Sequence, residues 1–143
     1  MSGKLDTQIN EFDDLVTQLK FKLHSGDSAC LTDHCMTPGQ FFTGCILRNH
    51  INLTMSELAE KLHTSLSTVT GLIDRMVKNK YVERNRVDTD RRLVKVRLSK
   101  KGIKTIDKMQ LQKIQNLRSM LSVLNEKDRV QYLKLMRKLV EGL

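Results

Sequence analysis

The stretch from Thr54 to Leu98 decides the fold, and it reads TMSELAEKLHTSLSTVTGLIDRMVKNKYVERNRVDTDRRLVKVRL. It predicts a helix, a tight turn and a second helix, followed by two strands at Val82–Val87 and Leu93–Leu98. The loop between the strands, Asp88–Arg92, contains two arginines. This order of elements is that of a winged helix-turn-helix, in which the second helix enters a major groove and a basic loop lies beside it.

The positive charge of the chain is concentrated on the same stretch. Residues 75–104 contain twelve Lys or Arg and three Asp or Glu, which gives a net charge of +9. The whole chain also has a net charge of +9, so the remaining residues sum to zero. A local basic surface on the hairpin and its flanks is what binding to nucleic-acid phosphates requires.

Length and composition favour a single globular domain. The 143 residues are 39% hydrophobic and 29% charged, and a single proline leaves room for long helices. No window is apolar enough to cross a membrane or to serve as a signal peptide, so we expect a cytoplasmic protein. Three cysteines, an odd number, do not indicate a disulfide framework in that compartment.

Long amphipathic helices are predicted at both ends of the chain. Apolar residues recur every three or four positions from Leu5 to Leu23, which marks one helical face. Thr37-Pro38-Gly39-Gln40 is a capping box that starts the next helix. Ser99 is predicted to cap a helix reaching about Leu124, and Asn125 to cap a last helix ending near Gly142.

We therefore predict a mainly α fold, a winged helix-turn-helix with long N- and C-terminal helices that form a dimerisation domain. Residues 1–143 are assigned to one domain. Within it, residues 37–98 form the DNA-binding lobe, and residues 5–36 and 99–143 supply the dimerisation helices and a loop. The terminal helices have no evident small core of their own, so we expect packing against each other and against a second subunit to bury them.

The second helix of the motif, predicted over residues 66–79, is the candidate DNA-reading helix. Its predicted buried side carries Val69, Leu72, Ile73 and Met76. The exposed side and its margins provide short hydroxyls near the helix start, which can reach base edges or phosphates. The candidate contacts are Ser65, Ser67, Thr68, Thr70, Gly71, Arg75 and Lys78. A helical hairpin with a polar outer face is the alternative when this helix pair is considered alone.

The hairpin supplies the second set of candidates. An arginine at its tip can enter a narrow A·T minor groove, and Asp90 could hold the guanidinium of Arg92 by a charge-assisted bond. The alternative is a solvated turn with an incidental ion pair. Strand cations are candidates for phosphate contacts, although some could be solvated. The hairpin candidates are Arg84, Arg86, Asp90, Arg91, Arg92 and Lys95.

With these residues in place, the chain resembles the MarR family of winged helix-turn-helix transcriptional regulators. The resemblance covers nearly the whole chain. It implies a homodimer on a pseudo-palindromic operator, with each recognition helix in a major groove and each wing in the adjacent minor groove. It also implies repression that a small molecule or an oxidant relieves, without a cofactor. The segments that carry it are TPGQF (37–41), TMSELAEKL (54–62), SLSTVTGLIDRM (65–76), DTDRR (88–92) and LSKKG (98–102).

Two positions depart from the family pattern. Gly71 stands where the family often has a long polar or basic side chain, so one base or phosphate contact is in doubt. His63 occupies a turn position where glycine is common, and histidine tolerates a left-handed backbone at modest cost.

The cysteines raise two further possibilities. Cys30, His34 and Cys35 lie between the first two helices, with His24 just before them, but their spacing matches no strong zinc pattern. A redox switch at Cys30 or Cys35 is the next alternative, although no nearby Lys or Arg would lower a thiol pKa. We prefer adventitious thiols and expect no metal; Cys45 is expected in the core.

Two other classes of function are possible for this sequence. An enzyme is disfavoured because the chain has no phosphate-binding glycine loop, no order of Ser, His and Asp that suggests a nucleophile and no carboxylate pair with an evident role. An architectural or protein-binding winged helix would keep the fold without reading an operator.

Overall fold

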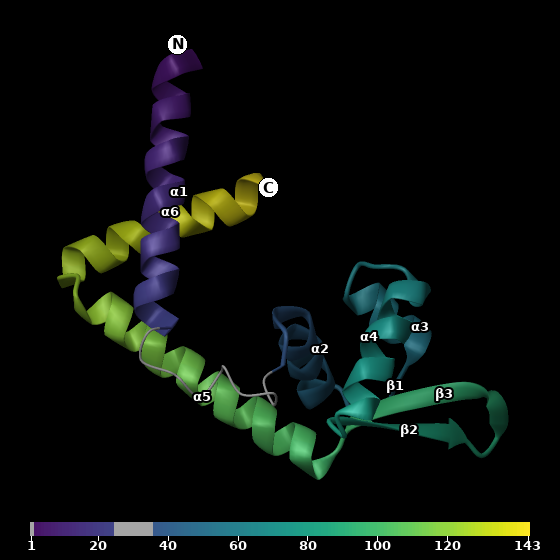
Figure 1. Cartoon of the computed structure of the whole chain (residues 1–143). Coiled ribbons are helices and arrows are strands. Elements are labelled where there is room, and N and C mark those ends of the chain that lie inside the picture. The colour runs from purple at the N-terminus through teal and green to yellow at the C-terminus, as the bar shows by residue number, and fades with distance from the viewer. Residues whose placement is uncertain (1, 25–35) are drawn as a thin grey trace. The chain divides into compact units, whose positions relative to one another are not determined.

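The computed structural model describes residues 2–24 and 36–143. The chain divides into two compact units. The central unit is Met36–Lys113, and the terminal unit combines Met1–Cys35 with Ile114–Leu143. The helices and strands are α1 (Ser2–His24), α2 (Pro38–Asn49), β1 (Leu53–Thr54), α3 (Met55–Lys61), α4 (Leu66–Lys78), β2 (Val82–Val87), β3 (Asp90–Leu98), α5 (Lys100–Ser122) and α6 (Glu126–Gly142) (Figure 1). The mainly helical fold with a small wing sheet is therefore confirmed.

Local capping fixes where the helices begin. Before α2, the Thr37 hydroxyl accepts the amide of Gln40 at 3.2 Å, and the Gln40 side chain accepts the Thr37 amide at 3.0 Å. Thr54 and Glu57 repeat this capping box before α3, at 3.2 and 2.7 Å. The backbone amide of Thr54 lowers the pKa of the Glu57 carboxyl by donating to it. Both predicted boxes are confirmed.

Left-handed residues end the two helices of the helix-turn-helix. His63 has φ 51° after α3, and the amides of His63 and Thr64 bond back to the carbonyls of Glu60 and Ala59. Lys80 has φ 64° after α4, and the amides of Lys80 and Tyr81 donate to the carbonyls of Val77 and Met76 in the same pattern. Both ends are Schellman motifs, which favour glycine at the left-handed position. His63 therefore has the left-handed backbone expected at this turn position, where the family commonly has glycine.

The wing is an antiparallel sheet with strand order β1-β3-β2. One expected boundary was wrong, and one strand was not expected. The second hairpin strand begins at Asp90 instead of Leu93, because Val87 pairs with Asp90 and the ladder is irregular beyond Arg86. Residues Leu53–Thr54 add a third strand, paired with Val96 and Lys95, that the sequence did not indicate. The hairpin projects from the central unit with its tip away from α5 (Figure 1).

One core fills the central unit. Its fully buried apolar side chains come from α3, α4, β3 and α5, namely Leu58, Val69, Ile73, Met76, Val96 and Ile106. Glycine permits two of the closest approaches. A Cβ on Gly102 would lie 2.0 Å from the carbonyl oxygen of Tyr81, and one on Gly44 would lie 2.3 Å from Cδ1 of Ile106. The start of α5 therefore packs directly against the wing base and α2.

The terminal unit consists of helices with many solvent-exposed apolar side chains. Helix α6 has no buried residue. Helix α1 runs three residues further toward the N-terminus than predicted, and α5 ends two residues earlier. No helix among the described residues is both long and apolar enough to cross a bilayer.

Candidate nucleic-acid interface

Helix α4 presents its polar side outward because its apolar side is fixed in the core. Val69, Ile73 and Met76 are fully buried, and Leu72 is half-buried. The helix spans residues 66–78, within one residue of the prediction. All seven candidate contacts on or before it are exposed: Ser65, Ser67, Thr68, Thr70, Gly71, Arg75 and Lys78.

Most of the hydroxyls at the start of α4 already have local partners. Ser65 caps the helix, and its hydroxyl accepts the amide of Thr68 at 3.2 Å. The hydroxyls of Ser65 and Thr68 lie 2.8 Å apart, and that of Thr70 donates to the Leu66 carbonyl at 2.8 Å. Ser67 is the exception, since its hydroxyl has no hydrogen-bond partner in the part of the chain that the structure describes. Ser67 therefore keeps its hydroxyl proton available as a donor, and so does whichever of Ser65 and Thr68 accepts in the bond between their hydroxyls.

An ion pair joins α4 to the wing. The guanidinium of Arg84 on β2 donates to the carboxylate of Asp74 on the exposed side of α4. Arg97 and Glu83 form a second, cross-strand pair at 3.2 Å nearer the wing base. The sequence missed both pairs, because each joins residues ten or more positions apart on different elements. Arg84 neutralises the one carboxylate on α4, where a phosphate-binding surface would otherwise carry negative charge.

The wing tip is organised differently from the prediction. Asp90 accepts a hydrogen bond from the backbone amide of Arg92 at 3.0 Å instead of holding its guanidinium. This bond shapes the turn, as Asp side chains often do, and leaves the exposed guanidinium of Arg92 free to reach outward. Arg86 is exposed and Lys95 is half-buried. The side chain of Arg91 lies outside the described residues, as do Cys30, His34 and Cys35.

The chain is similar in sequence to known transcriptional regulators. A sequence profile described as the MarR family matches residues 36–94. YsmB of Bacillus subtilis, an uncharacterized HTH-type transcriptional regulator, is 34% identical over 98 residues, which cover 68% of this chain and 67% of that protein. The chain belongs to the MarR family. The HTH-type transcriptional repressor NicR of Pseudomonas putida is 30% identical over 110 residues, covering 77% of this chain and 70% of NicR.

A solved structure agrees on the fold. FabT of Streptococcus pneumoniae, determined in complex with DNA, superposes with a TM-score of 0.74 at 18% identity, covering 99% of this chain and 96% of that one. As a member of the MarR family, the protein is a DNA-binding transcriptional regulator and not an enzyme.

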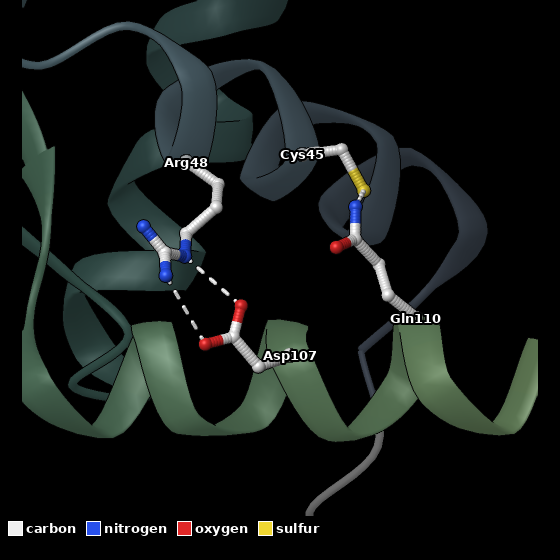
Figure 2. A network of polar contacts seen from close by, with 4 residues as sticks. All are labelled: Cys45, Arg48, Asp107 and Gln110. Carbon is white, nitrogen blue, oxygen red and sulfur yellow. Dashed lines mark hydrogen bonds and ion pairs between the residues drawn. The ribbon is translucent and has the colours of Figure 1, made fainter.

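A polar network joins α2 to α5 inside the central unit of this MarR protein (Figure 2). Nε of Arg48 donates to Asp107 at 2.9 Å, and a second guanidinium nitrogen reaches the other carboxylate oxygen at 3.3 Å. The bond from Arg48 lowers the pKa of the Asp107 carboxyl and raises that of the guanidinium. Beside it, Gln110 donates to Sγ of Cys45 at 3.3 Å. Cys45, expected in the core, is half-buried and packs against it.

A hollow of about 670 Å³ lies at the base of the wing, between the end of α2 and the start of α5. Its floor is apolar, from Leu47, Leu98 and Ile103, and its rim carries five cationic side chains and Glu83. Two of these cations, Arg48 and Arg97, are paired with Asp107 and Glu83. Among the described residues, no group of His, Cys, Asp and Glu could hold a metal ion.

Proposed function

We propose that the protein is a homodimeric, sequence-specific repressor that acts in the cytoplasm on a pseudo-palindromic operator. Helix α4 of each subunit enters a major groove, and each wing reaches the adjacent minor groove. The exposed surface of α4 beside an exposed wing arginine supports this arrangement. The relative NicR, which is named a repressor, supports the sign of regulation.

The observation that carries the proposal is the exposed apolar surface of the terminal helices. Phe12 of α1 is 64% exposed, and α6 adds exposed apolar residues without burying one. Isolated apolar residues are common on surfaces, but a continuous series at helical spacing indicates a partner. A second copy of the chain offers the same surface, as a two-fold symmetric interface requires. The exposed apolar residues of these helices include Leu5, Ile9, Phe12, Leu111, Ile114, Leu117, Val130, Leu133, Met136 and Val140.

Charge would supply the sequence-independent part of the affinity. Of the wing cations, Arg86 and Arg92 are exposed and form no ion pair among the described residues. Lys78 on α4 is exposed as well. Each phosphate contact releases counterions, so operator affinity should fall steeply as the salt concentration rises.

Release of the operator would follow from a change in the spacing of the two DNA-binding lobes. Two recognition helices must enter successive major grooves about 34 Å apart, so a modest change in their separation costs affinity. The effector is either a small molecule or an oxidant. An oxidant would act through Cys30 or Cys35, whereas a small molecule would require neither thiol.

The first experiment is footprinting on the DNA upstream of the gene, against a scrambled duplex, with and without hydrogen peroxide. A protected symmetric site of about 20 base pairs is expected, since two half-sites lie one helical turn apart. Loss of protection with peroxide and recovery with thiol would identify the oxidant as the signal. Protection that peroxide leaves unchanged would assign release to a small molecule.

The alternative is an architectural winged helix that binds DNA without reading an operator. Equal affinity for promoter and random duplexes would favour this alternative, provided that selection from a random library also enriches no sequence. Light scattering tests the homodimer independently of DNA binding. A monomer at micromolar concentration would contradict it.

A further inference from the structure

The start of α4 presents an apolar ridge where a recognition helix meets base edges. Leu66 is the first residue of the helix, and the residue is 51% exposed. Thr70 lies four residues later, which places it on the same side of the helix, one turn along. Two neighbouring side chains at the end of the helix that enters the groove are thus available to DNA.

The hydrogen bond of Thr70 decides which of its groups is available. Its hydroxyl donates to the carbonyl of Leu66 at 2.8 Å, so its only proton is already used. The γ-methyl is the other branch on the same Cβ, and the residue is exposed. A threonine held this way offers a methyl group and an acceptor oxygen, but no donor.

The rest of this surface has no long hydrogen-bonding side chain. Residues 65–73 read SLSTVTGLI and contain no Arg, Lys, Asn, Gln, Asp or Glu. Two-point recognition of guanine requires Arg or Lys, and that of adenine requires Asn or Gln. Gly71 has no atom within 4 Å of the position where its Cβ would be, so it leaves the surface open to a close partner.

From this surface we infer that Leu66 and the γ-methyl of Thr70 read thymine C5-methyl groups in the major groove of each half-site. Thymine is the one base that presents a methyl group there, and apolar side chains contact it. The operator class that follows has A·T pairs under the start of α4. An exposed arginine at the wing tip fits the same class, because narrow A·T minor grooves attract arginine. The inference rests on the proposed operator binding.

The test begins with selection of bound duplexes from a random library by the purified full-length protein. Failure to enrich any sequence would count against the proposed function itself. An enriched site whose half-sites lack thymine opposite the start of α4 would overturn the inference and leave operator binding intact. We expect conserved thymines in both half-sites.

Each conserved thymine is then replaced by deoxyuridine, which keeps the base pair and removes only the methyl group. Affinity should fall roughly fourfold for each methyl that is buried against the protein. Deoxyuridine outside the half-sites is the control and should change nothing. The inference is overturned if deoxyuridine at every conserved thymine leaves the affinity unchanged.

Matched variants of Thr70 assign the contact to an atom. Thr70→Val keeps a methyl and removes the hydroxyl, so it should bind as the wild type does and keep its sensitivity to deoxyuridine. Thr70→Ser keeps the hydroxyl and removes the methyl, so it and Leu66→Ala should each lose that sensitivity at one thymine. The reverse result, with Thr70→Val impaired and Thr70→Ser unchanged, would show that the hydroxyl reads the base. Thermal melting verifies that these exposed substitutions leave the fold intact.

Discussion

Leu58, Val69 and Ile73 of the central unit are fully buried within one chain, whereas Phe12 and Leu133 of the terminal unit are exposed. The central unit therefore contains what it needs to fold, namely a shared core under a helix-turn-helix and a wing. The terminal unit has an apolar series on its helices, but no buried core of its own among the described residues. The fold of the central unit and the proposed assembly into a dimer thus depend on different residues, which can be altered separately.

The largest effect is expected at the terminal unit, which the proposed dimer would bury. Phe12→Ala removes a large apolar side chain twice in a symmetric dimer, at roughly 2 kcal/mol each. The dimer dissociation constant should therefore rise about a thousandfold, as measured by analytical ultracentrifugation. Gln18→Ala, on the opposite polar face of α1, is the matched control and should leave it unchanged. An equally stable dimer in Phe12→Ala would place the interface elsewhere.

The next effect concerns the central unit alone. Gly102→Ala would put a Cβ 2.0 Å from the backbone oxygen of Tyr81, which no side-chain rotation can relieve. We expect a loss of about 3 kcal/mol in the free energy of unfolding, measured by urea denaturation. Gly71→Ala has open space around it and should instead stabilise α4 by about 1 kcal/mol. Similar behaviour of the two alanine variants would contradict this description of the wing base.

A smaller effect should leave both units folded and change DNA binding only. Arg92→Ala removes an exposed guanidinium at the wing tip and should lower operator affinity by about 2 kcal/mol, with melting and dimerisation unchanged. Asp90→Ala is a useful comparison, because it removes the bond to the Arg92 amide while keeping the guanidinium. An unchanged dissociation constant for Arg92→Ala would exclude the wing from the interface.

The sequence predicted best what neighbours in the chain determine. The capping residues Thr37, Thr54, Ser65 and Asn125 each precede a helix, as expected, because their bonds span three residues. The sequence failed where distant residues meet. The short strand β1 forms only by pairing with β3, and Asp74 meets Arg84 only once α4 and β2 are packed. The sequence alone placed the candidate DNA-reading helix, but the local hydrogen bonds of its hydroxyls were visible only in the structure.

The smallest expected effect concerns the coupling of α4 to the wing through Asp74 and Arg84, which are both partly exposed. Exposed pairs contribute at most about 1 kcal/mol to stability, so neither single variant should melt much earlier. DNA binding should be more sensitive. Arg84→Met leaves the Asp74 carboxylate uncompensated on a surface that approaches phosphates, and Asp74→Asn/Arg84→Met removes both charges. Operator affinity should therefore fall in the single variant and recover in the double variant.

The salt dependence of binding separates this positioning role from the direct phosphate contact predicted for Arg84. Loss of a phosphate contact lowers the slope of log affinity against log salt by about one per subunit, whichever residue occupies position 74. If Arg84 instead serves to neutralise Asp74, the double variant should keep the wild-type slope along with its affinity. A double variant with weak binding and a reduced slope would return Arg84 to the phosphate contacts. The wing would then be joined to α4 by packing alone, and the ion pair in the free protein would give way to DNA.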